Sequence, residues 1–259
     1  MTHLPLRLAG RTALVTGASR GIGEAIAADL ARNGATVLLA SRKRAGLEEA
    51  AARIRAAVPE AALQIHPCHT GDPAAIAALF QVLDAAGTTV DLLVNNAATN
   101  PFFGPLIDAD GAAWDKTFAV NLRGPFELSR EVARRLMAAE RPGSIINVSS
   151  IFGMTGAPFQ GLYAMSKAAL ISLTRTLAVE WGGARIRVNA IAPGLVETRF
   201  SSVLVGNEEL VKRYTDRAAL GRYGQPEEIA GMVTFLGSDE AAYVTGQVMV
   251  LDGGWTVGA

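Results

Sequence analysis

The stretch Thr12-Ala-Leu-Val-Thr-Gly-Ala-Ser-Arg-Gly-Ile-Gly23 decides the fold of this chain. Its first five residues are apolar or β-branched and predict a buried strand, and an apolar helix from Ile22 to Leu30 begins within the glycines. Glycines at such a turn let the backbone bend sharply and approach an anion at the helix N-terminus, where free N–H groups and the dipole favour negative charge. A strand, a glycine turn and a helix in this order predict a dinucleotide-binding site.

The rest of the chain repeats this alternation. Short β-rich runs occur at residues 12–16, 36–40, 63–67, 90–95, 144–149, 187–192 and 247–251. Segments with helical periodicity separate them, at residues 21–33, 44–57, 73–86, 111–138, 162–181 and 226–237. Several runs are almost entirely apolar, which is typical of strands covered on both faces of a parallel sheet. The order predicts an α/β fold, a Rossmann-type doubly wound sheet of about seven parallel strands with helices on both faces and a ligand crevice at the carboxyl strand ends.

Length and composition limit the domain organisation. The chain has 259 residues, 50% of them hydrophobic, and neither a Pro/Ser-rich nor a charged linker divides it. Residues 1–259 are therefore predicted to form a single domain. The segment 195–225 breaks the alternation and is interpreted as a small helical substrate lid, with an ordinary surface connection as the alternative.

The charge balance excludes several classes of partner. Twenty-four basic and 24 acidic residues leave no net field to attract nucleic acid or an anionic membrane, and no apolar run is long enough to span a bilayer. The N-terminal residues lack an apolar signal region, so we expect a soluble cytoplasmic protein with small-molecule partners. Cys68 has no second cysteine to pair with, and His3, His66 and His69 lack metal-site spacing, so no metal is expected.

Polar and basic residues follow the second strand, where the choice between dinucleotides is made. NAD enzymes place an acid there to hold the ribose 2′-hydroxyl. This chain instead has Ser41, Arg42 and Lys43, and Arg20 in the glycine turn adds another positive charge. A hydroxyl beside guanidinium groups suits a 2′-phosphate, whereas basic residues that merely began a solvated helix would oppose its dipole. The sequence therefore predicts NADP(H) as the cofactor.

Tyr163 and Lys167 stand four residues apart in Gly161-Leu-Tyr-Ala-Met-Ser-Lys167 and so share one helical face. Ser150 lies thirteen residues before Tyr163, behind a strand. A phenol with a pKa of about 10 is a poor acid–base catalyst at neutral pH, but an adjacent cation favours phenolate and lowers that pKa. The spacing alone also fits a buried tyrosine and a solvated lysine. In combination with the glycine turn, it predicts proton transfer to a carbonyl polarised by the serine.

These ordered motifs resemble the short-chain dehydrogenase/reductase family over about residues 8–255. Gly17, Gly21 and Gly23 match its cofactor turn, and Asn95-Asn-Ala-Ala98 is similar to its Asn-Asn-Ala-Gly segment. The resemblance implies hydride transfer between nicotinamide C4 and a carbonyl or secondary alcohol. The implied catalytic tetrad is Asn121, Ser150, Tyr163 and Lys167. The expected dinucleotide-binding residues are Gly17, Ser19, Arg20, Gly21, Ile22, Gly23, Ser41, Arg42, Lys43, His69, Thr70, Asn95, Ala97, Tyr163, Lys167, Pro193, Gly194, Val196 and Thr198.

The resemblance also implies a role for each member of the tetrad. In the reductive direction, Ser150 donates a hydrogen bond to the substrate oxygen and Tyr163 delivers the proton. Lys167 lowers the pKa of the tyrosine and holds the nicotinamide ribose, while Asn121 shapes a relay through a water bound to a freed helix carbonyl. The chain departs from the family pattern at His69, which stands where the family has an aspartate beside the adenine.

Within the family, the motifs are most similar to NADP-dependent carbonyl reductases and retinol dehydrogenase-like members. This similarity predicts a homotetrameric oxidoreductase that interconverts a ketone or aldehyde with its alcohol. The alternatives are a polyol or sugar-acid dehydrogenase and a 3-oxoacyl-carrier-protein reductase; Arg141 matches one carrier-gripping position, but Ala184 occupies the other. The complete tetrad disfavours a non-enzymatic NADP-binding regulator. Several apolar residues lie near these motifs and favour a mostly apolar substrate; the alternative is that they belong to the core or to an interface. They are Phe102, Phe103, Ile151, Phe152, Met154 and Phe159.

Overall fold

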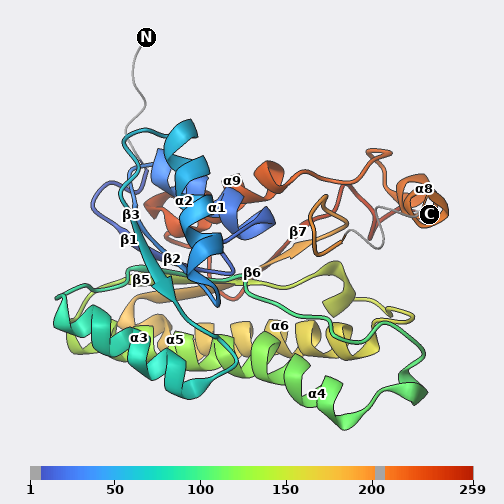
Figure 1. The fold of residues 1–259 in the computed structure, drawn as a ribbon, viewed down its shortest axis with the longest axis horizontal. Helices are drawn as coiled ribbons and strands as arrows, with labels where there is room; N and C mark the ends of the chain where they lie inside the picture. The colour runs from blue at the N-terminus through green and yellow to red at the C-terminus, as the bar shows by residue number, and fades with distance from the viewer. Residues whose placement is uncertain (1–6, 202–207, 259) are drawn as a thin grey trace.

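The computed structural model describes residues 7–201 and 208–258, and its strands form one sheet in the order β3-β2-β1-β4-β5-β6-β7 (Figure 1). The strands are β1 (Thr12–Thr16), β2 (Thr36–Ser41), β3 (Leu63–Pro67), β4 (Leu92–Asn95), β5 (Gly143–Val148), β6 (Ile186–Pro193) and β7 (Val248–Leu251). All neighbouring pairs are parallel. The predicted doubly wound sheet of seven parallel strands is confirmed, with every strand end within two residues of its predicted position.

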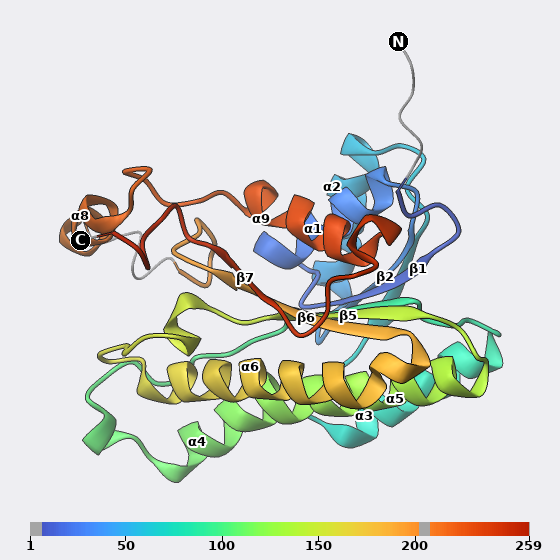
Figure 2. The same cartoon turned by 180° about the vertical axis from the view of Figure 1, so that it is seen from behind.

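Helices cover both faces of this sheet (Figures 1 and 2). One layer consists of α1 (Gly21–Arg32), α2 (Arg44–Ala57) and α9 (Pro226–Gly237). The other consists of α3 (Pro73–Ala85), α4 (Gly111–Phe118), α5 (Gly124–Ala138) and α6 (Gly161–Trp181). The strand order reverses direction at β1, which lies between β2 and β4. In open α/β sheets, ligands bind outside the carboxyl strand ends at such a switch point.

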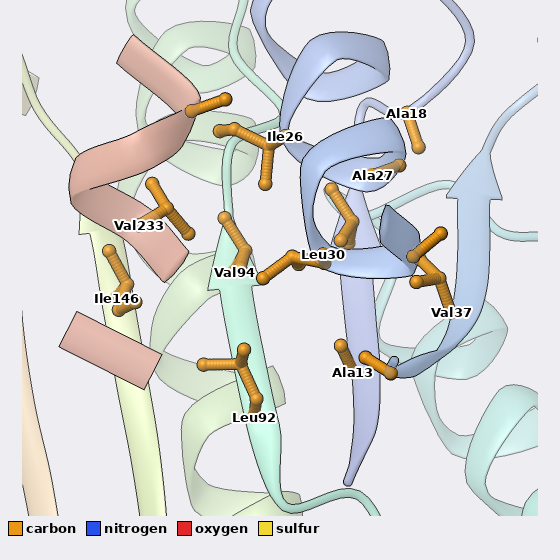
Figure 3. Close-up of a cluster of buried hydrophobic side chains, with 14 of the residues drawn as sticks. Ala13, Ala18, Ile26, Ala27, Leu30, Val37, Leu92, Val94, Ile146 and Val233 are labelled. Atoms are coloured by element: carbon orange, nitrogen blue, oxygen red, sulfur yellow. The ribbon is translucent and has the colours of Figure 1, made fainter. Parts of the chain in front are cut away.

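Alternating side chains of the central strands build two cores. Ala13 and Val15 of β1 belong to the core under α1 and α9, whereas Leu14 between them belongs to the core on the other face. Figure 3 shows the first core, in which Ile26 and Leu30 of α1 pack among residues of the sheet. Because successive side chains of a strand point to opposite faces, short apolar strands supply both cores at once.

The predicted helix over residues 111–138 is wrong in one respect, because a π-helical turn, Ala119–Arg123, separates α4 from α5. Asn121 lies in this turn and is completely buried. Its Oδ1 accepts a hydrogen bond from the Thr99 amide at 2.8 Å, and its Nδ2 donates to the Thr99 carbonyl at 2.9 Å. These tertiary bonds, together with Pro125 near the start of α5, favour a local break in the regular hydrogen-bond ladder.

The segment 195–225, predicted as a lid, contains a loop after β6 and helix α8 (Glu208–Arg217), which lies beside the C-terminal residues (Figures 1 and 2). Residues 202–207 of that segment lie outside the described residues. Tyr214 of α8 accepts a hydrogen bond from the Leu195 amide at 2.8 Å and donates one to the Asp252 carbonyl at 3.3 Å. The tyrosine thus fastens α8 to the ends of β6 and β7. No described helix is long and apolar enough to cross a membrane.

Candidate active site

A cleft of about 1000 Å³ opens at the carboxyl end of the sheet, where the fold places the switch point. Its walls come from the glycine turn between β1 and α1, the ends of β2 to β6, helices α6 and α8, and the C-terminal segment. The described part of the chain holds no group of three or more His, Cys, Asp or Glu that could bind a metal. The cleft is the place where the predicted residues can meet a ligand.

Ser150, Tyr163 and Lys167 meet on the floor of the cleft. Ser150 follows β5 and is hydrogen-bonded to the Tyr163 side chain. The Lys167 Nζ donates to the Val148 carbonyl at 2.7 Å and lies 5.5 Å from the centre of the Tyr163 ring. Ser149 is held differently, since its hydroxyl donates to the Lys167 carbonyl at 2.9 Å. The serine that faces the tyrosine is therefore Ser150, as the spacing predicts.

Burial changes the protonation of both helical residues. It raises the pKa of Tyr163 to about 12, although the hydrogen bond with Ser150 acts in the opposite direction. It lowers the pKa of Lys167 to about 7. The expectation that Lys167 lowers the pKa of Tyr163 is therefore wrong in its net direction, because desolvation disfavours both charged forms. At neutral pH, Tyr163 holds its proton and is a proton donor.

Asn121 reaches this floor from behind rather than lining the cleft. Its Nδ2 donates to the Ser166 Oγ at 3.0 Å, and that hydroxyl donates to the Tyr163 carbonyl at 2.7 Å. Together with its bonds to Thr99, these contacts connect the loop after β4 to the turn of α6 that carries Tyr163. The geometry makes Asn121 a brace for the tyrosine helix.

The glycine turn forms one end of the cleft and fits an anion. Gly17 and Gly21 have positive φ angles of 66° and 57°, and a Cβ on Gly23 would lie 2.4 Å from the Gly17 carbonyl oxygen. Arg20, the N-cap residue of α1, makes no side-chain capping bond to the helix. The first N–H groups of a helix have no intrahelical partner, and they favour a phosphate. A Cβ on Gly21 would lie 3.2 Å from Thr198, so the loop after β6 closes over the same turn.

Serines and arginines from the glycine turn and from the end of β2 line the same part of the cleft. The hydroxyls of Ser19 and Ser41 lie 3.3 Å apart, and the exposed residues Arg20 and Arg42 line the cleft beside them. No Asp or Glu is among the described residues that line the cleft. Hydroxyl and guanidinium donors with no nearby carboxylate can hold a phosphate ester.

The structure brings most predicted site residues to the cleft and leaves three outside its lining. Asn121 acts from behind, as described. Asn95 is buried in β4, where its Nδ2 donates to the Asn147 Oδ1 at 2.9 Å and the Ser129 Oγ at 3.1 Å, so its side chain is bonded inside the protein and its cofactor contact stays a prediction. Lys43 is exposed at the N-cap of α2 and is not among the residues that line the cleft, so its cofactor contact also stays a prediction.

Several lining residues escaped the sequence analysis. Asn96 lines the cleft in place of Asn95, and its Nδ2 donates to the Thr16 carbonyl at 2.8 Å. Phe200 reaches over the Tyr163 ring with 5.8 Å between ring centres. The C-terminal part contributes Arg213, Tyr214, Arg217 and Trp255. Phe200, Arg213, Tyr214 and Arg217 lie in the segment 195–225 that the sequence predicts as a substrate lid, whereas Trp255 follows β7 and had no such signal.

Comparisons with known proteins agree with this geometry. Residues 17–256 match a family model described as enoyl-(acyl carrier protein) reductase. Dehydrogenase/reductase SDR family member 4 from Homo sapiens is 38% identical over 247 residues, which cover 95% of this chain and 88% of that protein.

Solved structures are similar along almost the whole chain. A gluconate 5-dehydrogenase from Burkholderia cenocepacia in complex with NADP and tartrate superposes with a TM-score of 0.92 at 32% identity, covering 98% of each chain. A 4-hydroxyisoleucine dehydrogenase complexed with NADH gives a TM-score of 0.89 at 31% identity, covering 96% of this chain and 100% of the other. The chain therefore belongs to the short-chain dehydrogenase/reductase family of nicotinamide-dependent oxidoreductases, whose members act on alcohol and carbonyl groups.

Proposed function

We propose that the protein is an NADP(H)-dependent oxidoreductase that interconverts a ketone or aldehyde and its alcohol, with Tyr163 as the general acid and base. The observation that carries the proposal is Tyr163, hydrogen-bonded to Ser150 on the floor of a cleft that the glycine turn between β1 and α1 also lines. A proton donor and a phosphate cradle in one crevice suit carbonyl reduction by a dinucleotide.

Each residue of the floor has a separate role in the reduction. When bound, the reduced nicotinamide supplies a hydride to the carbonyl carbon. Ser150 donates a hydrogen bond to the carbonyl oxygen, and Tyr163 transfers its proton to that oxygen as the C–O π bond breaks. Lys167, with a pKa of about 7, can return a proton to the floor and can bind ribose hydroxyls. In the oxidative direction, Tyr163 receives the proton of the alcohol.

The preference for NADP(H) over NAD(H) rests on four residues. The cleft lining includes Ser19 and Arg20 of the glycine turn and Ser41 and Arg42 at the end of β2. In this fold class, the ribose 2′-substituent of a dinucleotide lies there. The described lining contains no acid that would accept the two free ribose hydroxyls. The comparison with an NADP complex supports this choice, and the NADH complex of another relative makes a direct test necessary.

A substrate panel tests the proposal. The purified protein is given NADPH or NADH with ketones, aldehydes, sugar acids and a 2-enoyl thioester, and nucleotide absorbance is followed. We expect faster turnover of carbonyl compounds with NADPH than with NADH. Reduction of the enoyl thioester alone, as the family model's description would suggest, or absence of turnover despite NADPH binding, contradicts the proposal.

The alternative of a carrier-protein reductase is less well supported. Arg141, the residue that matches a carrier-gripping position, lies outside the cleft lining and donates a 2.5 Å hydrogen bond to the buried Asp91. A charge already paired with a buried carboxylate is poorly available to a carrier protein. A sugar-acid dehydrogenase gains support from the basic residues that line the cleft without an accompanying Asp or Glu among the described lining residues.

We also propose a homotetramer in the cytoplasm. Val179 on α6 is 84% exposed and Met137 on α5 is 39% exposed, so these two helices present apolar side chains to solvent. Symmetric packing of such helices would cover these side chains. Light scattering should give four times the chain mass at micromolar concentration, and a monomer mass throughout the range contradicts the assignment.

A further inference from the structure

The part of the cleft lined by α8 carries positive charge that the proposed dinucleotide chemistry does not use. The cations among the described lining residues are Arg20, Arg42, Lys116, Lys167, Arg199, Arg213 and Arg217, and no Asp or Glu accompanies them. Arg20 and Arg42 are assigned to the cofactor, and Lys167 belongs to the catalytic floor. Arg213 and Arg217 come from a different element, α8, and have no role in that scheme.

These two arginines share one face of α8, because they are four residues apart. Arg217 is held in place by the C-terminal segment: its Nε donates to the Trp255 carbonyl at 3.1 Å, and its guanidinium carbon lies 4.1 Å from the Trp255 ring centre. Both arginines are exposed and line the cleft. They can therefore meet an entering ligand without first breaking a buried ion pair.

Continuous contacts connect α8 to the catalytic floor. Tyr214 stacks on Trp255 with ring centres 5.8 Å apart, and Trp255 meets the edge of Phe152 at 6.3 Å. Phe152 in turn donates its backbone N–H to the Ser150 Oγ at 3.2 Å. A Cβ on Gly194 would lie 2.0 Å from the Tyr214 hydroxyl, so glycine at this position lets α8 sit close to the end of β6. These contacts connect α8, the helix that carries both arginines, to the segment that holds Ser150.

We infer that the substrate carries an oxyanion, a carboxylate or a phosphate, away from its reacting carbonyl, and that Arg213 and Arg217 bind this group. The inference rests on the proposed function and names the substrate class for the same site. Guanidinium groups form charge-assisted hydrogen bonds with both kinds of oxyanion. The rings of Trp255 and Phe200 line the cleft and can cover the carbon chain between the two ends.

Matched substrate pairs test the inference. The probes are 4-oxopentanoate with its methyl ester, and dihydroxyacetone phosphate with dihydroxyacetone, each reduced with saturating NADPH. The variants are Arg213→Gln, Arg217→Gln and the double substitution. The control is Lys212→Gln on the same helix, since Lys212 pairs with Asp216 and does not line the cleft.

The parent and the control should prefer the anionic member of at least one pair, and the pair identifies the oxyanion. Each arginine substitution should reduce that preference in kcat/KM by about 10-fold, and the double substitution by about 100-fold, since hydrogen bonds to charged groups contribute roughly 1.5 to 3 kcal/mol each. The KM for NADPH should be the same in all five proteins.

Three outcomes overturn the inference. They are preference of the parent for the neutral member of both pairs, an equal effect of the arginine substitutions on both members, and a rise in the KM for NADPH, which would place the arginines on the cofactor. If no carbonyl compound is turned over, the proposed function fails. Calorimetry of 4-oxopentanoate binding to the parent and the double variant with NADPH then still decides the inference: stronger binding to the parent supports it, and equal binding contradicts it.

Discussion

The floor and the rim of the cleft differ in burial, and this difference separates catalysis from selection. Lys167 and Asn121 on the floor are almost fully buried, and Tyr163 is 9% exposed. Arg42 and Arg213 on the rim are exposed to solvent. Burial shifts the pKa values of Tyr163 and Lys167 by desolvation, whereas exposed guanidinium groups are open to anions from solvent. Changes in the floor should alter rate, and changes in the rim should alter which molecules are accepted.

The largest effect should come from Tyr163→Phe, which keeps the ring and removes the transferable proton. Turnover should fall by about 10²- to 10⁴-fold, while the dissociation constant for NADPH changes little. Steady-state rates and fluorescence titration measure the two quantities. Tyr223→Phe is the matched control, since Tyr223 does not line the cleft. Retained turnover in Tyr163→Phe would show that Tyr163 does not supply the proton.

At the rim, the double substitution Ser41→Asp and Arg42→Ala should invert the cofactor preference. It removes a guanidinium that can meet the 2′-phosphate and adds a carboxylate that repels it and accepts the free ribose hydroxyls. We expect the parent to prefer NADPH by about 10²- to 10³-fold in kcat/KM. The parent with NADPH and the double variant with NADH should reach similar maximal rates, because the substitutions leave the catalytic floor unchanged. A parent that already favours NADH contradicts the assignment of residues 41–42.

Lys167 should give the stability of the protein a specific pH dependence. Its folded pKa of about 7 lies below the usual value of 10.5, so between these values the unfolded chain binds more protons than the folded one. The free energy of unfolding should therefore rise with pH from about 7 toward 10, by up to about 1.4 kcal/mol per pH unit. In Lys167→Met this contribution is absent, whereas it persists in the control Lys212→Met. Urea unfolding at pH 7, 8 and 9 measures the slopes, and parallel slopes in all three proteins contradict the burial argument.

The smallest of these effects should follow from Asn121→Ala, because the brace acts only through other residues. Loss of its bonds to Thr99 and Ser166 should lower kcat by about 10-fold and should change the KM for the carbonyl compound by a smaller factor. The control Asn33→Ala removes one amide bond at the end of α1, far along the chain from the floor. An increase in KM alone, with kcat unchanged, would show that Asn121 does not position the tyrosine helix.

The sequence predicted those parts of the fold that depend on local pattern. The glycine turn, the apolar strands and the Tyr163–Lys167 spacing each follow from neighbours in the chain, and the structure places them as expected. The break at Ala119–Arg123 was not predictable in this way, since the hydrogen bonds that favour it come from Thr99 and Ser166. The periodicity of residues 111–138 is helical on both sides of it.

Other features could not be predicted for the same reason, because they depend on tertiary structure. Asn95 is the last residue of β4 and its side chain bonds to Asn147, whereas Asn96, just after the strand, lines the cleft. The net direction of the pKa shift of Tyr163 depends on burial by distant segments, including Phe200. The role of Trp255 required knowledge that the C-terminal segment returns to α8.

The most direct test of the account follows the hydride and the proton together. NADPH carrying deuterium at nicotinamide C4 is given to the parent and to Tyr163→Phe with a carbonyl compound accepted in the panel, and the alcohol is analysed by mass spectrometry and NMR. The account predicts deuterium on the carbinol carbon in the parent reaction and a rate lower by at least about 10²-fold in the variant. Alcohol without deuterium at that carbon, or equal rates in the two proteins, would contradict it.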